Sequence, residues 1–152
     1  MSKKVVLAFS GGLDTSFCVP YLKNEHGYEV HTVMVNTGGF SAEEEKAIEQ
    51  RALTLGATSH KTVNAVETYY NKGIKYLIYG NILKNATYPL SVSSERVFQA
   101  LEVLRHVKEL GADAVAHGST GAGNDQVRFD IVFEILAPAV EIIAPVREHC
   151  FT

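Results

Sequence analysis

Short runs of apolar residues alternate along this chain with longer segments in which apolar positions recur at helical spacing. A continuous apolar run lies at residues 4–9, the pattern of a strand buried on both faces of a parallel sheet, and residues 29–36 predict a second strand. The short segments at residues 59–63, 114–117 and 142–144 are predicted to be three more strands. Because strands and helices alternate throughout, the chain is predicted to be an α/β domain, a parallel sheet with helices on both faces.

The predicted helices begin and end at residues that favour helix termini. Ser41 with Glu44, and Asn64 with Glu67, have the spacing of a capping box. A glycine follows two of the helices, where it can take the left-handed conformation that stops them. The predicted helices cover residues 15–24, 41–55, 64–79, 94–110 and 127–136.

Polar segments that contain glycine follow the first and the fourth predicted strands, at residues 10–16 and 118–125. In an open parallel sheet, ligands bind beyond the carboxyl ends of the strands. Both segments are therefore candidates for a ligand site.

The first of these segments reads SGGLDTS and joins a strand to a helix. Its glycines allow a close backbone approach, and the free N–H groups at a helix start favour an anion. It is neither a Walker A loop nor a G-x-G-x-x-G loop. A phosphate group is the expected ligand, with a plain tight turn as the structural alternative. Asp14 is expected either to approach a magnesium ion or to order the loop.

Length and charge limit the function classes. The 152 residues suit a single domain, and no linker divides residues 1–152. The formal net charge of −3 gives no overall attraction to nucleic acid or to an anionic membrane. Only five apolar residues follow Lys4, too few for a signal peptide or a membrane span, so a cytoplasmic location is expected.

Cys18 and Cys150 are the only cysteines. Two cysteines provide neither a disulfide framework nor a complete zinc site, so both are expected to be reduced and no protein-only metal site is predicted. Cys18 is expected to pack in the core on the first helix.

Residues 10–16 resemble the S-G-G-x-D-[ST]-[ST] loop of the N-type ATP pyrophosphatases, which release pyrophosphate from ATP. Several enzymes share that loop, so it does not name a substrate. Residues 117–129 read HGSTGAGNDQVRF and resemble the H-G-[AS]-T-G-x-G-N-D-Q-V-R-F motif of argininosuccinate synthases. The resemblance runs over the whole chain, to residues 144–148, and implies an adenine nucleotide α-hydrolase-like, Rossmann-like fold.

The family resemblance implies a ligation that uses ATP and Mg²⁺. The ureido oxygen of citrulline attacks the α-phosphorus of ATP, pyrophosphate leaves, and the amine of aspartate displaces AMP from citrullyl-adenylate. Argininosuccinate is the product, on the route to arginine. Such chemistry needs alignment and charge stabilisation more than a nucleophilic side chain. No histidine is therefore expected to be a catalyst, and His117 is left open between a structural and a functional role.

The resemblance also implies which residues would meet each ligand. Asp125 would accept hydrogen bonds from the α-ammonium of aspartate, and Thr120 would donate to a carboxylate of aspartate. Asn124 would contact aspartate and also face citrulline. Arg128 would hold the carboxylate of citrulline. The residues around ATP would be Ala8, Phe9, Ser10, Gly11, Gly12, Leu13, Asp14, Thr15, Ser16, Val35 and Gly118. Those around the two amino acids would be Tyr88, Ser93, Thr120, Asn124, Asp125 and Arg128. The catalytic candidates are Ser10, Asp14 and Asp125.

The chain departs from the family pattern in two places. Where many members read Tyr-x-Leu-Gly-Thr-Ser-Ile-Ala-Arg-Pro, residues 88–97 read YPLSVSSERV, so the backbone near Ser93 is expected to differ. Asn36 stands where an aspartate is commoner. Neither change removes a group that the chemistry requires.

Family members are longer than this chain and carry a second domain that closes over citrulline and forms a homotetramer. That domain is expected to be absent here, which leaves the activity of the isolated domain open. Two other function classes remain open. Another ATP pyrophosphatase, such as a tRNA-modifying enzyme, would be expected to show a basic face or catalytic cysteines. A non-catalytic nucleotide-binding module of the universal-stress type would carry its glycine-rich phosphate loop later in the chain.

Overall fold

A computed structural model of the chain describes residues 2–148. Its centre is a five-stranded sheet in the order β3-β2-β1-β6-β7, with every neighbouring pair parallel. The register pairs Val5 of the central strand with Val30 on one side and with Ala114 on the other. The predicted parallel sheet is confirmed, and all five predicted runs belong to it. The strands are β1 (Lys4–Ala8), β2 (Glu29–Asn36), β3 (Ser59–Asn64), β6 (Ala114–His117) and β7 (Glu141–Ile143).

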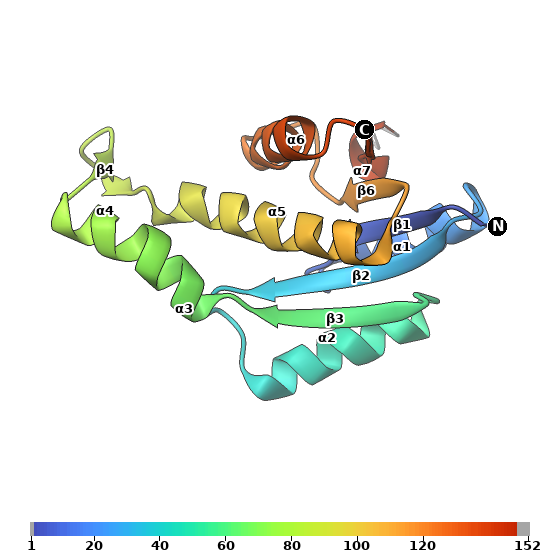
Figure 1. Cartoon of the computed structure of the whole chain (residues 1–152). Coiled ribbons are helices and arrows are strands. Elements are labelled where there is room, and N and C mark those ends of the chain that lie inside the picture. The colour runs from blue at the N-terminus through green and yellow to red at the C-terminus, as the bar shows by residue number, and fades with distance from the viewer. Residues whose placement is uncertain (1, 149–152) are drawn as a thin grey trace.

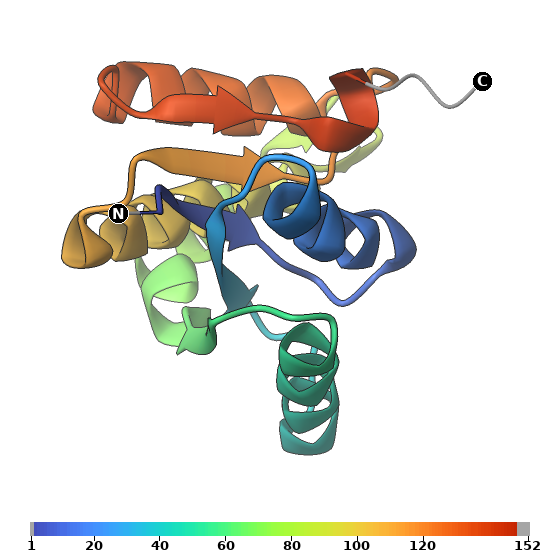
Figure 2. The same ribbon diagram turned by 90° about the vertical axis from the view of Figure 1, so that its right-hand side faces the viewer.

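Helices cover both faces of this sheet, as predicted. One face carries α1 (Leu13–Asn24) and α2 (Ala42–Thr54), and the other carries α5 (Ser91–Leu110) and α6 (Asp125–Leu136). Figure 2 shows α1 and α5 on opposite sides of β1. Alternate side chains of β1 enter the two cores: Val5 and Leu7 pack toward α1, and Val6 packs toward α5. All three are fully buried, and burying an aliphatic side chain contributes about 1.5–3 kcal/mol.

Three helices begin earlier than the sequence pattern predicts. The first residue of α1 is Leu13 rather than residue 15, that of α5 is Ser91 rather than 94, and that of α6 is Asp125 rather than 127. Their first turns are mainly polar, so apolar periodicity detects each helix only from its second turn.

One predicted capping box is confirmed and the other is wrong. Ser41 Oγ accepts a hydrogen bond from the Glu44 N–H at 3.3 Å, and the Glu44 carboxylate accepts from the Ser41 N–H at 2.8 Å. Asn64 instead ends β3, and its Oδ1 accepts from the Val66 N–H at 3.1 Å. The N-cap of the next helix is Ala65 because Asn64 still pairs in the sheet.

The predicted helix at residues 64–79 is three consecutive pieces, α3 (Val66–Tyr69), a π-helical turn η1 (Tyr70–Ile74) and α4 (Lys75–Tyr79). A small hairpin that the sequence did not predict, β4 (Leu83–Lys84) with β5 (Tyr88–Pro89), follows it. Residues 66–89 together form an arm, and Figure 1 shows it reaching past the carboxyl ends of β2 and β3.

The arm is held against α5 by aromatic packing. The Tyr69 hydroxyl donates to the Ser91 carbonyl at 2.6 Å, and its ring lies 4.9 Å from that of Phe98, centroid to centroid. A Cβ on Gly73 would lie 3.1 Å from the Phe98 ring, so the absence of a side chain there lets the two helices meet.

Cys18 packs in the core, as predicted, with no exposed surface. Burial, assisted by the negative charge of Asp14, raises the pKa of its thiol to about 12. Cys150 lies outside the described residues. After β7 the chain forms a last short helix, α7 (Pro145–Glu148). Within residues 2–148, no helix combines the length and the apolar character needed to cross a membrane.

Candidate functional site

The carboxyl ends of β1, β2 and β6 open into a cleft of about 740 Å³. The two glycine-bearing segments lie in its wall together, with one side of α5 opposite them. The sequence-predicted residues that line it are Ala8, Phe9, Ser10, Gly12, Leu13, Asp14, Thr15, Val35, Tyr88, Gly118, Thr120, Asn124, Asp125 and Arg128. The predicted residues outside its wall are Gly11, Ser16 and Ser93.

Helix α1 begins at this cleft. Its N-cap residue is Gly12, which has no side chain to accept a hydrogen bond from the first turn. The hydroxyl contacts of the loop are long. Thr15 Oγ1 lies 3.3 Å from both Ser10 Oγ and the Gly12 carbonyl, and Ser10 Oγ accepts from the Gly12 N–H at 3.4 Å. Bonds of this length are weak, so these groups can turn to a ligand at little cost. The positive end of the helix dipole favours an anion there.

The loop after β6 passes close to the start of α1. A Cβ on Gly118 would lie 2.9 Å from Thr15 Cγ2 and 3.1 Å from the Thr15 backbone nitrogen. Contacts this short force one of the two segments to move. Only glycine therefore lets the backbone at residue 118 lie beside the donors of the first loop.

Gly11 and Ser16 shape the loop from behind the cleft. Gly11 has a left-handed φ of +75°, and a Cβ there would lie 2.9 Å from Ile48 Cγ1. Its carbonyl accepts a hydrogen bond from Nη1 of Arg51 in α2. Ser16 Oγ is buried and has no hydrogen-bond partner within the described residues. Gly11 thus fixes the shape of the turn. The Ser16 hydroxyl remains able to donate a hydrogen bond near it.

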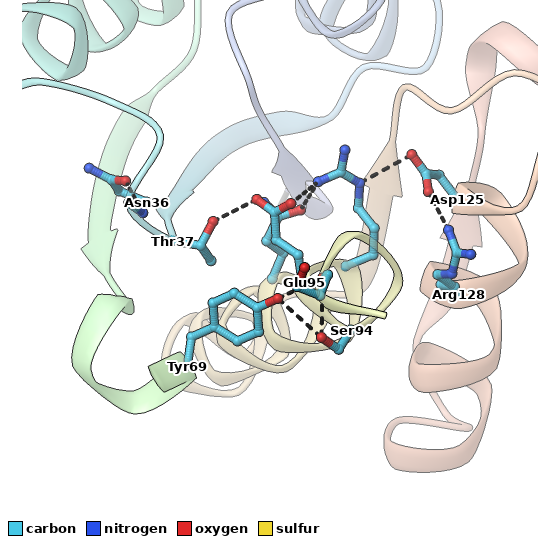
Figure 3. A network of polar contacts seen from close by, with 11 residues as sticks. Asn36, Thr37, Tyr69, Ser94, Glu95, Asp125 and Arg128 are labelled. Carbon is cyan, nitrogen blue, oxygen red and sulfur yellow. Dashed lines mark hydrogen bonds and ion pairs between the residues drawn. The ribbon is translucent and has the colours of Figure 1, made fainter. Parts of the chain in front are cut away.

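A series of polar contacts crosses the cleft from the end of β2 toward α6 (Figure 3). Thr37 Oγ1 donates to Glu95 Oε1 at 2.6 Å. Glu95 also accepts from Gln99 Nε2 at 3.1 Å and forms an ion pair with Arg96 Nη1 at 3.3 Å. The carboxylate of Glu95 therefore ties α5 to the loop after β2.

Asp125 lies between two arginines at the other end of this series. Arg96 Nε donates to one of its carboxylate oxygens at 3.1 Å, and Arg128 Nη1 donates to the other at 2.7 Å. Arg128 Nη2 also donates to Ser93 Oγ at 3.0 Å. Ser93 thus joins the site through Arg128, although it is not in the cleft wall. Both guanidinium groups have the planar geometry that suits a ligand carboxylate.

Asn36 orders the loop that leads from β2 to α2. Its amide nitrogen donates to Glu45 Oε1 at 2.6 Å and to the Phe40 carbonyl at 2.9 Å, while its oxygen accepts from the Gly38 N–H at 2.7 Å. An aspartate at this buried position would place two carboxylates in contact. The amide is therefore matched to Glu45, and Asn36 shapes the cleft through Phe40, which lines it.

Sequence reasoning missed the side chains of α5 that face the cleft. Glu95, Arg96, Gln99 and Val103 all line it, together with Phe40 from the loop after β2. Gln99 lies three residues after Arg96 and four after Glu95, and Val103 lies four residues further on, which is the spacing of a shared helix face. Glu95, Arg96 and Gln99 are polar, so the apolar periodicity that predicts the helix does not single out this face.

Comparison with known families supplies the decisive observation. The family model described as the arginosuccinate synthase N-terminal HUP domain matches residues 4–152. The chain belongs to the argininosuccinate synthase family. Its fold is therefore that family's HUP domain, the adenine nucleotide α-hydrolase-like fold expected from the sequence.

Curated relatives named argininosuccinate synthase support this assignment. The chain is 49% identical to one from Xanthomonas campestris pv. campestris over 147 residues, 97% of this chain and 36% of the relative. It is 46% identical to another from Saccharolobus solfataricus over 144 residues, 95% of this chain and 36% of the relative. The chain thus spans about a third of the length of these argininosuccinate synthases.

Solved structures with low sequence identity share the fold alone. A predicted subunit of tRNA methyltransferase from Methanocaldococcus jannaschii superposes with a TM-score of 0.62 at 20% identity, over 98% of this chain and 70% of that one. NMN synthetase from Francisella tularensis gives a TM-score of 0.58 at 10% identity, over 78% of this chain and 46% of that one.

Proposed function

We propose that this chain is the ATP-binding domain of an argininosuccinate synthase, which joins citrulline to aspartate through citrullyl-AMP and releases AMP and pyrophosphate. The observation that carries the proposal is the close approach of Gly118 to the uncapped start of α1. That approach brings the two family motifs, more than a hundred residues apart in sequence, into the wall of one cleft.

The phosphates of ATP would lie at the start of α1. The backbone N–H groups of the loop, with the hydroxyls of Ser10 and Thr15, are donors that a phosphate chain can take up. The backbone at Val35, which lines the cleft at the end of β2, would face the adenine. Gly118 would contact the nucleotide from the opposite side.

Mg²⁺ would bind at this site together with the phosphates of ATP. Among residues 2–148, no three histidine, cysteine, aspartate or glutamate side chains gather as ligands for a metal ion. Mg²⁺ is commonly held by one or two carboxylates together with substrate phosphates, and Asp14 lines the cleft in the first turn of α1. A bound Mg²⁺ would neutralise charge on the departing pyrophosphate.

The two amino acids would use the arginine and carboxylate groups at the far side of the cleft. Arg128 would turn its guanidinium to the carboxylate of citrulline, and Tyr88 and Ser93 would complete that side. Asp125 would then accept hydrogen bonds from the ammonium of aspartate, beside Thr120. Holding the ureido oxygen of citrulline in line with the α-phosphorus, and then the amine of aspartate beside the adenylated ureido carbon, can lower the barriers by roughly 7–11 kcal/mol.

The whole ligation extends beyond what this chain carries, because the chain spans only 36% of the length of its relatives. We propose that the remaining substrate contacts and the assembly of a homotetramer belong to the rest of such an enzyme. We also propose that it acts in the cytoplasm on small molecules, without nucleic acid or membrane.

The test is the set of products that this domain, joined to the remaining two thirds of a family member, forms from Mg·ATP, citrulline and aspartate. We expect AMP and pyrophosphate to appear only when citrulline is present, with argininosuccinate requiring aspartate as well. Asp125→Asn should abolish argininosuccinate formation more than pyrophosphate release. Asp113 lies at the other end of the sheet, where its carboxylate accepts from the Lys4 N–H. The matched variant Asp113→Asn should therefore leave argininosuccinate formation and pyrophosphate release unchanged. Formation of ADP, or cleavage that ignores citrulline, would contradict the proposal.

A further inference from the structure

His117, the last residue of β6, is held in a fixed plane. Its ring stacks on that of Phe129, with centroids 5.6 Å apart and planes 16° apart, and the Phe133 ring lies 6.4 Å away. Only 1% of the histidine is exposed. The ring directly precedes the turn at residues 118–120, which contains two of the proposed ligand contacts.

Neighbouring groups decide which ring nitrogen carries the proton. The Ser119 N–H donates to Nδ1 of His117 at 3.2 Å, so Nδ1 must be an unprotonated acceptor. Nε2 must then carry the proton, and it lies 2.9 Å from the Asp130 carboxylate. Burial holds the pKa of His117 below its ordinary value, although Asp130 partly opposes that shift, so the ring stays neutral.

Arg147 in α7 holds the other side of that carboxylate. Its Nη1 donates to Asp130 Oδ2 at 2.5 Å and lies 3.4 Å from Gln126 Oε1. Burial alone raises the pKa of Asp130, but the hydrogen bonds from Arg147 and His117 bring it below its usual value. Asp130 therefore remains an acceptor for both neighbours.

We propose that Asp130 and Arg147 are positioning residues that lock His117 in its Nε2-protonated form and thereby fix the turn at residues 118–120 for ligand binding. Neither residue touches the ligands of the proposed function. Each acts through the histidine, whose Nδ1 accepts the Ser119 N–H and so sets the start of the turn. The proposal rests on the proposed function only for the identity of those ligands.

The two positioning residues act together, and this gives a test that a merely structural role would not satisfy. In Asp130→Asn, the single side-chain oxygen of the asparagine should accept from Arg147 and not from His117, because hydrogen bonds from charged donors are the stronger ones. The amide NH₂ then faces Nε2 of His117. The ring proton must then move to Nδ1. Nδ1 can no longer accept the Ser119 N–H, and two donors face each other.

Removing Arg147 as well reverses this effect. In the double variant Asp130→Asn with Arg147→Met, the asparagine oxygen is released and can accept from Nε2–H again. The second substitution, which deletes a further interaction, should therefore restore the original tautomer. Arg147→Met alone keeps the carboxylate and should keep that tautomer too.

The experiment measures the side-chain ¹⁵N shifts of His117 and the affinity for Mg·ATP in the same samples. We expect a protonated Nε2 in the wild type, a protonated Nδ1 in Asp130→Asn, and a protonated Nε2 in the double variant. The affinity for Mg·ATP should fall roughly three- to tenfold in Asp130→Asn, the effect of losing one hydrogen bond, and should largely recover in the double variant. Asp113→Asn is the control and should change neither readout.

A proton that stays on Nε2 in Asp130→Asn would overturn the proposal, and so would a double variant that binds no better than the single one. A wild-type chain without affinity for Mg·ATP would instead contradict the proposed function. The ¹⁵N shifts, and the amide shift of Ser119, would still decide whether the histidine is locked as proposed.

Discussion

At residue scale, nucleotide binding in the cleft depends on how closely two backbone segments approach at Gly118. The Cβ of Gly118→Ala would lie 2.9 Å from Thr15 Cγ2 and 3.1 Å from the Thr15 nitrogen. Relieving such overlap typically costs about 1–3 kcal/mol of stability. We expect Gly118→Ala to lower the affinity for Mg·ATP by on the order of tenfold, about 1.4 kcal/mol, as measured by calorimetry.

A second glycine provides the control for that substitution. A Cβ on Gly39 would meet nothing within 4 Å, and its φ is not in the left-handed region. Gly39→Ala should therefore bind Mg·ATP as the wild type does. Equal affinity in Gly118→Ala and the wild type would mean that the close approach does not matter for the nucleotide.

The thiol of Cys18 should be inert in the folded chain. It is fully buried, and burial raises its pKa to about 12, so almost no thiolate forms at neutral pH. In a Cys150→Ser background, we expect a thiol reagent at pH 8 to label no cysteine until the chain is unfolded with urea. Rapid labelling of the folded chain would show that this side of α1 opens to solvent.

At the scale of elements, the five strands of the main sheet were predictable, whereas most helix starts were not. β1 is buried on both faces, and its run of apolar residues between Lys4 and Ser10 shows its limits within a residue or two. The start of a helix is set by hydrogen bonds to groups outside it. Ser41 supplied such a bond locally, whereas Asn64 was already committed to the sheet. Capping spacing alone could not distinguish the two.

The candidate site shows the same division. Its two loops were found because each is a compact motif, and Asp125 and Arg128 lie within one of them. The contact between Thr37 and Glu95 joins residues 58 positions apart, and neither residue belongs to either motif. Only the packing of α5 against the end of β2 reveals that pair.

The Thr37–Glu95 contact can be measured with a double-mutant cycle. We expect Thr37→Val and Glu95→Ala to be coupled by about 1 kcal/mol in the free energy of unfolding, because the hydrogen bond reaches a partly buried carboxylate. Urea denaturation of the four chains gives the coupling. Thr54→Val paired with Glu95→Ala should be additive, since the Thr54 hydroxyl donates to the Gln50 carbonyl of its own helix, on the face of the sheet opposite α5. Additivity of the Thr37 pair would mean that the two elements are held together by other contacts.

At the scale of the whole molecule, buried histidines should make stability depend on pH. Burial lowers the pKa of His31, His60 and His117 below the ordinary value of 6.5. Below pH 6.5 the unfolded chain takes up protons that the folded chain does not, so the free energy of unfolding should fall as the pH falls. The slope should not exceed about 1.4 kcal/mol per pH unit for each histidine.

Urea denaturation between pH 7.5 and 5.5 measures this effect in a window where carboxylates stay charged. Single replacement of His117 by glutamine should make the slope shallower. A stability that is constant across this range, or that rises toward pH 5.5, would contradict the lowered pKa values of these three histidines.

The central claim is that Mg·ATP binds in the cleft formed by the two family motifs. The most direct measurement is a titration of the ¹⁵N-labelled chain with Mg·ATP, followed through its backbone amide signals. We predict saturable shifts concentrated at residues 10–16 and 118–120, with little change at the distant strand ends near Lys4 and Asp113. An absence of binding, or shifts centred on the arm at residues 66–89, would contradict the account.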